Sequence, residues 1–191
     1  MSHSRHMGSA GGEGYLQIHG GSQNIGIAWS ARGLLTRIHL GKSRSARGDV
    51  RRDGELTAPA RLVGLVEDLR EYFRSGRPIS RVSWEDVDLE SWTEFQKRVY
   101  SATARIPHGE SRTYGWVAQR IGVPAGSRAV GQALGRNPIP LLVPCHRVVS
   151  GRSGERALGG FMGESDPQAP ALRLKMRLLE LEDGFVNPRY L

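Results

Sequence analysis

Three prolines stand between positions 138 and 144, and this cluster constrains the chain more than any other local feature. Each proline fixes its backbone φ at about −65° and offers no N–H, so the stretch NPIPLLVPCHRVV, residues 137–149, cannot form a regular helix. A backbone this rigid is unfavourable unless the fold requires one fixed geometry in this segment. Cys145 ends the cluster, between Pro144 and His146, which indicates a fixed and reactive turn.

Cys145 is the only cysteine among the 191 residues. A lone cysteine excludes an intramolecular disulfide and a zinc site built from several cysteines, and we expect neither a metal nor another cofactor. A free thiol has a pKa of about 8.5, so little of it is thiolate at neutral pH unless a neighbouring group takes the proton. The imidazole of His146 is the adjacent candidate, acting directly or through a water molecule.

Glu182 is the candidate for a third group, which would orient the imidazole and stabilise its charged form. It ends a predicted amphipathic helix over 170–182, and its carboxylate can share the buried side of that helix. An unpaired buried carboxylate is costly, so His146 is its expected partner. Singly, these residues are more often structural than functional; together they favour a reactive site without naming its reaction. The apolar face of the helix carries Leu174, Leu178 and Leu181.

The chain is basic, with 27 lysines and arginines against 19 acidic residues, a formal charge of +8 and a pI near 10.3. Such a charge favours polyanionic partners, above all nucleic acid, although on its own it fits a merely soluble surface equally well. No apolar run approaches the length that crosses a bilayer, and we expect a cytoplasmic protein without a membrane partner. Residues 1–14 lack the apolar centre of a signal peptide and are expected to be a disordered tail or an expression remnant.

The first half, residues 15–92, has the pattern of a small α/β domain. Alternating residues over 15–40 predict short strands, joined by turns at Gly20-Gly21 and Gly33. Residues 41–54 are basic and almost free of apolar side chains, which predicts a loop. A helix is expected to begin at Pro59 and to end over 74–78, and another strand is expected within 79–89. The apolar face of that helix carries Leu62, Leu65, Val66, Leu69 and Phe73.

The second half, residues 93–184, is predicted to be mainly helical, followed by a tail over 185–191. Thr93 resembles an N-cap of its first helix. Thr113 is expected to cap a helix through Ile121, and after a glycine-bearing turn Ser127 is expected to cap the next one, which suits a helix-turn-helix. An ordinary helical hairpin fits the same pattern. On the second helix Val130 and Leu134 are expected inside and Arg128 outside, while its small residues, which let a backbone approach DNA, are Ala129, Gly131 and Ala133.

The string Pro144-Cys145-His146-Arg147-Val148 resembles the active-site signature of the O(6)-alkylguanine-DNA alkyltransferases. Four further segments are similar to that family in the same order, and the resemblance covers roughly residues 93–184. Residues 15–92 are similar only in forming a small α/β domain of comparable size. The resemblance implies a small ribonuclease H-like sheet plus helix, followed by a winged helix-turn-helix domain. The four segments are 106–114, 128–134, 137–140 and 178–182.

The resemblance also implies a function: irreversible, stoichiometric transfer of a methyl or other alkyl group from O(6) of guanine, and from O(4) of thymine, to Cys145. The partner would be double-stranded DNA, bound in the minor groove with the damaged base flipped out. His146 would act as base, Glu182 would orient it, and Asn137 would brace the reactive loop. Tyr114, Arg128, Ala129 and Gly131 would contact DNA. The guanine pocket would be lined by Leu134, Pro140, Val148, Phe161 and Met162.

Two segments depart from the family pattern, since 150–156 and 162–170 are longer than usual, and Met162 replaces a small polar residue. The range of alkyl groups that fit is therefore open, as is cooperation between copies on DNA; we expect a monomer in solution. The main alternative is a non-catalytic alkyltransferase-like protein that binds lesions, against which Cys145 argues. A transcriptional helix-turn-helix protein and a cysteine hydrolase rank lower, because neither an effector domain nor an oxyanion motif is recognisable.

Overall fold

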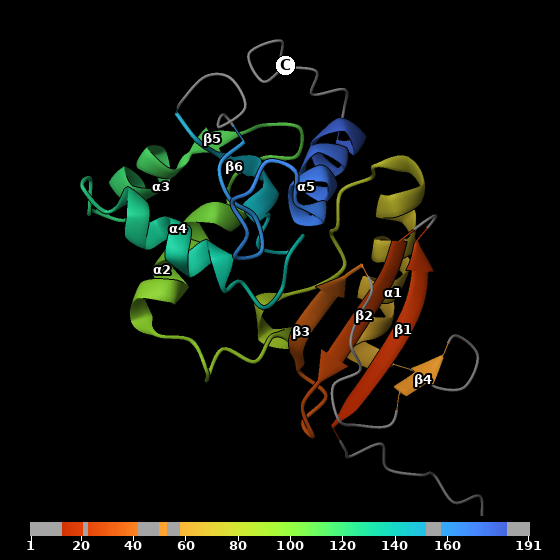
Figure 1. Ribbon diagram of the computed structural model, residues 1–191. Coiled ribbons are helices and arrows are strands. Elements are labelled where there is room, and N and C mark those ends of the chain that lie inside the picture. Colours follow the sequence, from red (N-terminus) through yellow and green to blue (C-terminus); the bar gives the residue numbers. More distant parts are fainter. Residues whose placement is uncertain (1–12, 21–22, 42–49, 53–57, 152–157, 183–191) are drawn as a thin grey trace, which may run out of the picture.

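A computed structural model describes residues 13–20, 23–41, 50–52, 58–151 and 158–182. Its first part is a four-stranded sheet in the order β3-β2-β1-β4, with the long helix α1 beside it (Figure 1). The β1–β2 and β2–β3 pairs are antiparallel, and β4 pairs with β1 in parallel. The bounds are β1 Gly14–Gly20, β2 Gln23–Trp29, β3 Leu35–Leu40, β4 Val50–Arg52 and α1 Ala60–Ser75.

The strands expected over 15–40 are confirmed, with Gly33 in the left-handed turn before β3 at φ 73°. Helix α1 begins after Pro59 and ends at Gly76, whose φ of 73° closes the helix with a hydrogen bond to the Tyr72 carbonyl. Four of the five expected apolar residues of α1 are buried, and Phe73 is half-buried. Alternation and helix-end residues therefore located these elements correctly, because both signals act over a few residues.

Two expectations in this half are wrong. The basic segment 41–54 is not a loop throughout, since Val50–Arg52 forms the edge strand β4, which pairs with β1. The segment 79–89 forms no strand; it contains the short 3-10 helix η1, Trp84–Asp86, and a single bridge from Val87 to Leu35. The reason is that the buried carboxylate of Asp68 accepts the backbone N–H groups of Ser80 and Arg81, which a strand would need for its ladder.

The second part contains four α-helices, of which α2, α3 and α4 pack against one another and α5 packs against η2 (Figure 1). Thr93 and Gln96 form a complete capping box at α2, and the Thr113 hydroxyl caps α3 by accepting the Trp116 N–H. The bounds are α2 Glu94–Ala104, β5 Arg112–Thr113, α3 Tyr114–Arg120, α4 Ser127–Gly135, η2 Cys145–Arg147, β6 Val148–Val149 and α5 Pro170–Leu181.

Helix α4 differs from expectation at two residues. Gly126, not Ser127, occupies the N-cap position, and Ser127 is the first helical residue without a capping hydrogen bond. Ala133 is 6% exposed and packs inward beside Val130 and Leu134, so it cannot face a partner. Arg128 is exposed as expected.

One continuous apolar cluster runs from the sheet through α1 into α2–α5 in the described part of the chain. The two parts also share a backbone hydrogen bond, from Ile38 N on β3 to the Pro138 carbonyl, 2.8 Å long. The proline cluster is thus held from both sides. Among the described residues no helix is long and apolar enough to cross a membrane. The expected tails 1–14 and 185–191 and most of the segment 150–156 lie outside the described residues, except positions 13–14 and 150–151.

Candidate active site

Cys145 is the first residue of η2 and its side chain is 4% exposed. Asn137 Nδ2 lies 3.2 Å from Cys145 Sγ and also donates to the Val143 carbonyl at 2.8 Å. The Asn137 side-chain oxygen accepts the Ile139 N–H at 3.1 Å. One amide therefore joins the thiol to the turn that precedes it, in the bracing position expected for Asn137.

The turn before the thiol carries an unusual backbone conformation. Leu141 has φ 77°, in the left-handed region that a branched side chain avoids, and it is buried. Holding such a residue costs about 1–3 kcal/mol. Pro140 on one side and the hydrogen bond from Val143 N to the Ile139 carbonyl, 3.0 Å long, restrict the turn to this geometry. The prolines thus hold a strained turn in place, directly before Cys145.

His146 and Glu182, 36 positions apart, meet in the interior: His146 Nε2 lies 2.8 Å from Glu182 Oε1, and neither side chain is more than 1% exposed. Burial lowers the pKa of His146, although the Glu182 carboxylate opposes that shift. His146 Nδ1 is buried without a hydrogen-bond partner in the described structure. With Nε2–H donating to the carboxylate, Nδ1 is left as a proton acceptor.

Two further residues bind the same carboxylate, and sequence reasoning assigned neither of them a role. Arg147 donates from Nε to Oε2 at 2.7 Å and from Nη2 to Oε1 at 2.9 Å, and Tyr72 donates its hydroxyl to Oε1 at 2.7 Å. Burial alone would raise the pKa of Glu182, but the hydrogen bonds from His146 and Arg147 outweigh it and hold that pKa well below its ordinary value. Glu182 is therefore an anion at neutral pH. No local pattern indicates that Tyr72 contacts Glu182, because the two residues are 110 positions apart in the sequence.

Lys175 on α5 is the third residue that sequence reasoning missed. It is fully buried, and its Nζ donates to the carbonyls of Val148 and Leu158 at 2.6 Å and of Gly160 at 3.1 Å. Burial lowers its pKa to about 7. The most buried face of α5 accordingly runs through Leu172, Lys175, Leu178, Leu179 and the C-cap Glu182; Leu174 and Leu181 are only partly buried.

A cavity of about 580 Å³ opens beside the thiol, between α4 and the segment 160–165. Of the expected pocket and DNA residues, it is lined by Tyr114, Arg128, Gly131, Leu134 and Phe161, together with Cys145. It is not lined by Pro140, Val148, Met162 or Ala129. Pro140 and Val148 are buried in the core, and Ala129 is exposed on α4. Gly163, Glu164 and Ser165 complete the wall instead.

Met162 lies outside the cavity because of the turn that carries it. Phe161 and Glu164 exchange two backbone hydrogen bonds, at 2.8 and 3.0 Å, and Met162 and Gly163 between them have φ of 53° and 82°. Two consecutive left-handed residues make a tight hairpin turn. Met162 is at its tip and is 42% exposed.

The Cys145 thiol faces this cavity in a protonated resting state. Burial raises its pKa, while the Asn137 hydrogen bond and the nearby charge of Lys175 act in the opposite direction. Tyr114 donates its hydroxyl to the Gly160 carbonyl at 2.9 Å, and burial raises its pKa as well, so it keeps its proton. The site thus brings together a shielded thiol, an imidazole with a free ring nitrogen, a buried anion and a tyrosine hydroxyl.

Comparisons with known proteins identify the family to which the chain belongs. Residues 94–184 match the family model of the 6-O-methylguanine DNA methyltransferase DNA-binding domain. A methylated-DNA--protein-cysteine methyltransferase of Mycolicibacterium paratuberculosis is 42% identical over 127 residues, which are 66% of this chain and 72% of that protein. The crystal structure of Mycobacterium tuberculosis OGT in complex with DNA is similar with a TM-score of 0.67 and 34% identity, covering 88% of this chain and 91% of that one. The chain therefore belongs to the methylated-DNA--protein-cysteine methyltransferase family.

Proposed function

We propose that this chain repairs double-stranded DNA by moving the alkyl group of O(6)-alkylguanine, and of O(4)-alkylthymine, onto Cys145 Sγ. Family membership establishes transfer to a cysteine, and Cys145 is the only one. The observation that carries the proposal is the position of its thiol. Cys145 faces a cavity bordered by α4, while its neighbour His146 is paired with a buried anion.

The reaction is a single displacement. The Cys145 proton passes to His146 Nδ1 through a water molecule, and the thiolate attacks the alkyl carbon. The new S–C bond forms as the C–O(6) bond breaks, and the bonding electrons leave with the guanine. Tyr114 lines the cavity, and its hydroxyl could protonate the departing base. No step regenerates the thiol, so each molecule acts once.

The DNA contacts follow from α4. Arg128 is exposed and lines the cavity, so it can occupy the space that an extruded base leaves in the duplex. Ala129 and Gly131 are small and let the helix backbone approach the minor groove. The net charge of +8 supports attraction to phosphates, with an affinity that falls as salt rises. A monomer acting on chromosomal DNA in the cytoplasm is part of the proposal.

The finer fold assignment belongs to the same proposal. The four-stranded sheet with α1 supports a ribonuclease H-like class for the first part, with a boundary near residue 92. Helices α3 and α4, together with the two-stranded β5–β6 ladder, support a winged helix-turn-helix class for the second.

Mass spectrometry tests the chemistry directly. The protein is incubated with a duplex that contains one O(6)-methylguanine and is then digested. We expect one equivalent of methyl on the peptide that bears Cys145, a gain of about 14 Da, and none after Cys145→Ser, which should still bind the duplex. Tight lesion binding by the natural protein, with an unmodified peptide, would instead support the non-catalytic lesion binder. Duplexes with larger alkyl groups would then measure the capacity of the cavity.

A further inference from the structure

Tyr72 is the single described residue of the segment 13–92 that binds the Glu182 carboxylate. The other donors come from the second part of the chain: His146, Arg147 and, at 3.4 Å, the N–H of Gly109. Tyr72 is 1% exposed, and burial, together with the adjacent Glu182, raises its pKa, so the hydroxyl keeps its proton and donates. A strong hydrogen bond to a buried anion thus crosses from one part to the other.

The last turn of α1 packs closely against the last turn of α5. A Cβ at Gly76 would lie 2.1 Å from the Leu181 carbonyl oxygen, a distance that no packing tolerates. Leu181 directly precedes Glu182. The glycine that ends α1 therefore lets the helix approach closely enough for Tyr72, one turn earlier, to reach the carboxylate.

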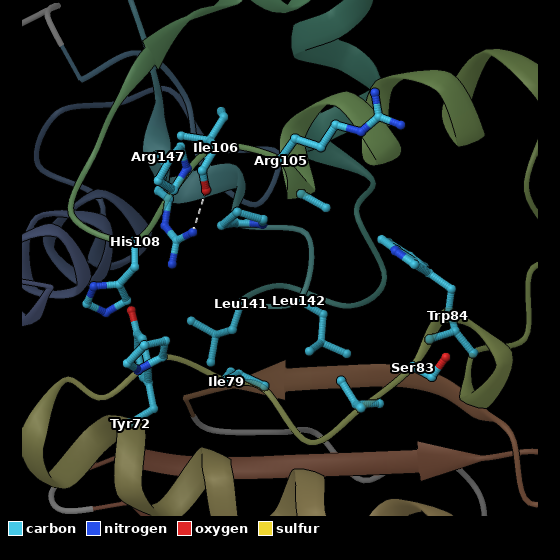
Figure 2. A pocket seen from close by; sticks show the side chains of 16 residues that line it. Tyr72, Ile79, Ser83, Trp84, Arg105, Ile106, His108, Leu141, Leu142 and Arg147 are labelled. Carbon is cyan, nitrogen blue, oxygen red and sulfur yellow. Dashed lines mark hydrogen bonds between the residues drawn. The ribbon is translucent and has the colours of Figure 1, made fainter.

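A cleft begins next to this buried hydrogen bond. The cleft, of about 340 Å³, separates the segment 78–87 from the proline cluster, and Tyr72, His108 and Arg147 stand together at one end of it (Figure 2). The Tyr72 and His108 rings meet edge to face, with centroids 6.4 Å apart.

The acceptor atom explains what the hydroxyl does. Tyr72 and His146 both donate to Oε1, whereas Arg147 binds both carboxylate oxygens as a fork. A fork alone fixes the two oxygens within the plane of the guanidinium but still allows the carboxylate to hinge out of that plane. The Tyr72 hydroxyl restricts that motion from the opposite part of the chain and keeps Oε1 against His146 Nε2.

We infer that Tyr72 is a positioning residue for the transfer reaction: the N-terminal part of the chain acts on Cys145 through one hydroxyl that holds Glu182 against His146. The inference rests on the proposed function in that His146 is taken as the base. Without the hydroxyl the imidazolium loses part of its stabilisation, and the thiolate forms at higher pH. The N-terminal part is then a component of the reactive site as well as a support.

The test compares Tyr72→Phe with Tyr100→Phe. Tyr100 is an equally buried tyrosine, but its hydroxyl donates to the Ala133 carbonyl at 2.9 Å and does not touch Glu182. Alkylation of Cys145 by iodoacetamide is followed from about pH 5 to pH 10 without DNA, alongside methyl transfer from DNA and urea unfolding. We expect Tyr72→Phe to raise the pH midpoint by about one unit and to slow transfer roughly 10-fold. Tyr100 lies close enough to Cys145 for the thiolate to raise the Tyr100 pKa, so Tyr100→Phe should move the midpoint by clearly less than Tyr72→Phe, whatever its effect on stability.

A second variant keeps the hydroxyl and moves the helix. Gly76→Ala should displace the end of α1 from α5 and raise the same midpoint. The inference is overturned if Tyr72→Phe keeps the natural midpoint, if Tyr100→Phe shifts it equally, or, should Tyr72→Phe not fold, if Gly76→Ala leaves it in place. A natural protein that takes no methyl from DNA would refute the proposed function instead, while the iodoacetamide profiles would still decide the role of Tyr72.

Discussion

At the scale of single residues, one carboxylate organises the site. Glu182 is 1% exposed and receives hydrogen bonds from a tyrosine, a histidine and an arginine. Because these donors hold its pKa below the ordinary value, the folded protein binds fewer protons there than the unfolded chain does. The carboxylate therefore contributes stability at neutral pH, and this contribution disappears as the pH falls below the ordinary range near 4.5.

Glu182→Gln should make this contribution visible. We expect a loss of about 3 kcal/mol in the free energy of unfolding at neutral pH, because the largely buried Arg147 guanidinium keeps its charge and loses its anion. The difference from the natural protein should shrink as urea unfolding is repeated from about pH 6 down to pH 3. The control is Glu67→Gln, since Glu67 pairs with Arg81 at the surface and should contribute under 1 kcal/mol, about the limit for exposed pairs. A constant difference across the pH range would contradict the assignment.

At the scale of elements, the turn over 161–164 shapes one wall of the cavity. Its two central residues, Met162 and Gly163, both lie in the left-handed region, and the methionine side chain projects outward. Glycine or asparagine suits the first of these positions better than methionine. The longer segment in this chain thus presents Gly163, Glu164 and Ser165 to the cavity and keeps Met162 away from it.

Met162→Asn should therefore stabilise the protein by up to about 1 kcal/mol, because the short polar side chain of asparagine tolerates the left-handed region better than methionine does. The rates of transfer from O(6)-methylguanine and from larger adducts should be unchanged, because the side chain does not line the cavity. Leu134→Ala provides the contrast. It shortens a side chain that lines the cavity, so it should enlarge the cavity and change the preference for adduct size. An altered preference in Met162→Asn would show that the side chain enters the pocket after all.

At the scale of the whole molecule, the two parts share one core. Apolar side chains form one cluster from the sheet to α5, and a backbone hydrogen bond joins Ile38 to Pro138 across the parts. The Tyr72–Glu182 contact adds a buried polar link. Such continuity couples the unfolding of the parts, since neither can lose its packing without exposing the other.

Thermal unfolding should accordingly be a single transition in which the calorimetric and van't Hoff enthalpies agree. Ile38→Ala on β3, a residue 3% exposed, should cost about 3 kcal/mol and reduce hydrogen-exchange protection in α5 as well as in the sheet. Exposed Val63→Ala serves as the control and should change neither measurement appreciably. Two separate transitions, or a loss of protection confined to the sheet, would show that the parts unfold independently.

The sequence by itself determined the features whose causes are local. Strand alternation, the caps at Thr93 and Thr113 and the proline cluster depend on residues a few positions apart, and the order of motifs identified the family before any contact was known. Two predictions failed because their causes are not local. The N-cap of α4 depends on which residue leaves helical geometry. The segment 79–89 is not a strand because Asp68, on α1, accepts the N–H groups of Ser80 and Arg81.

Only the tertiary structure decided how the site is held. Tyr72 and Glu182 are 110 positions apart, Arg147 and Glu182 are 35 apart, and Lys175 lies within reach of three carbonyls from two segments. No pattern along the chain encodes these meetings, because they arise from the way α1 and α5 pack. Cys145 and His146 are neighbours in the sequence, so their association can be predicted without a structure. The hydrogen bonds to the Glu182 carboxylate form only on folding, when burial makes each of these donors necessary.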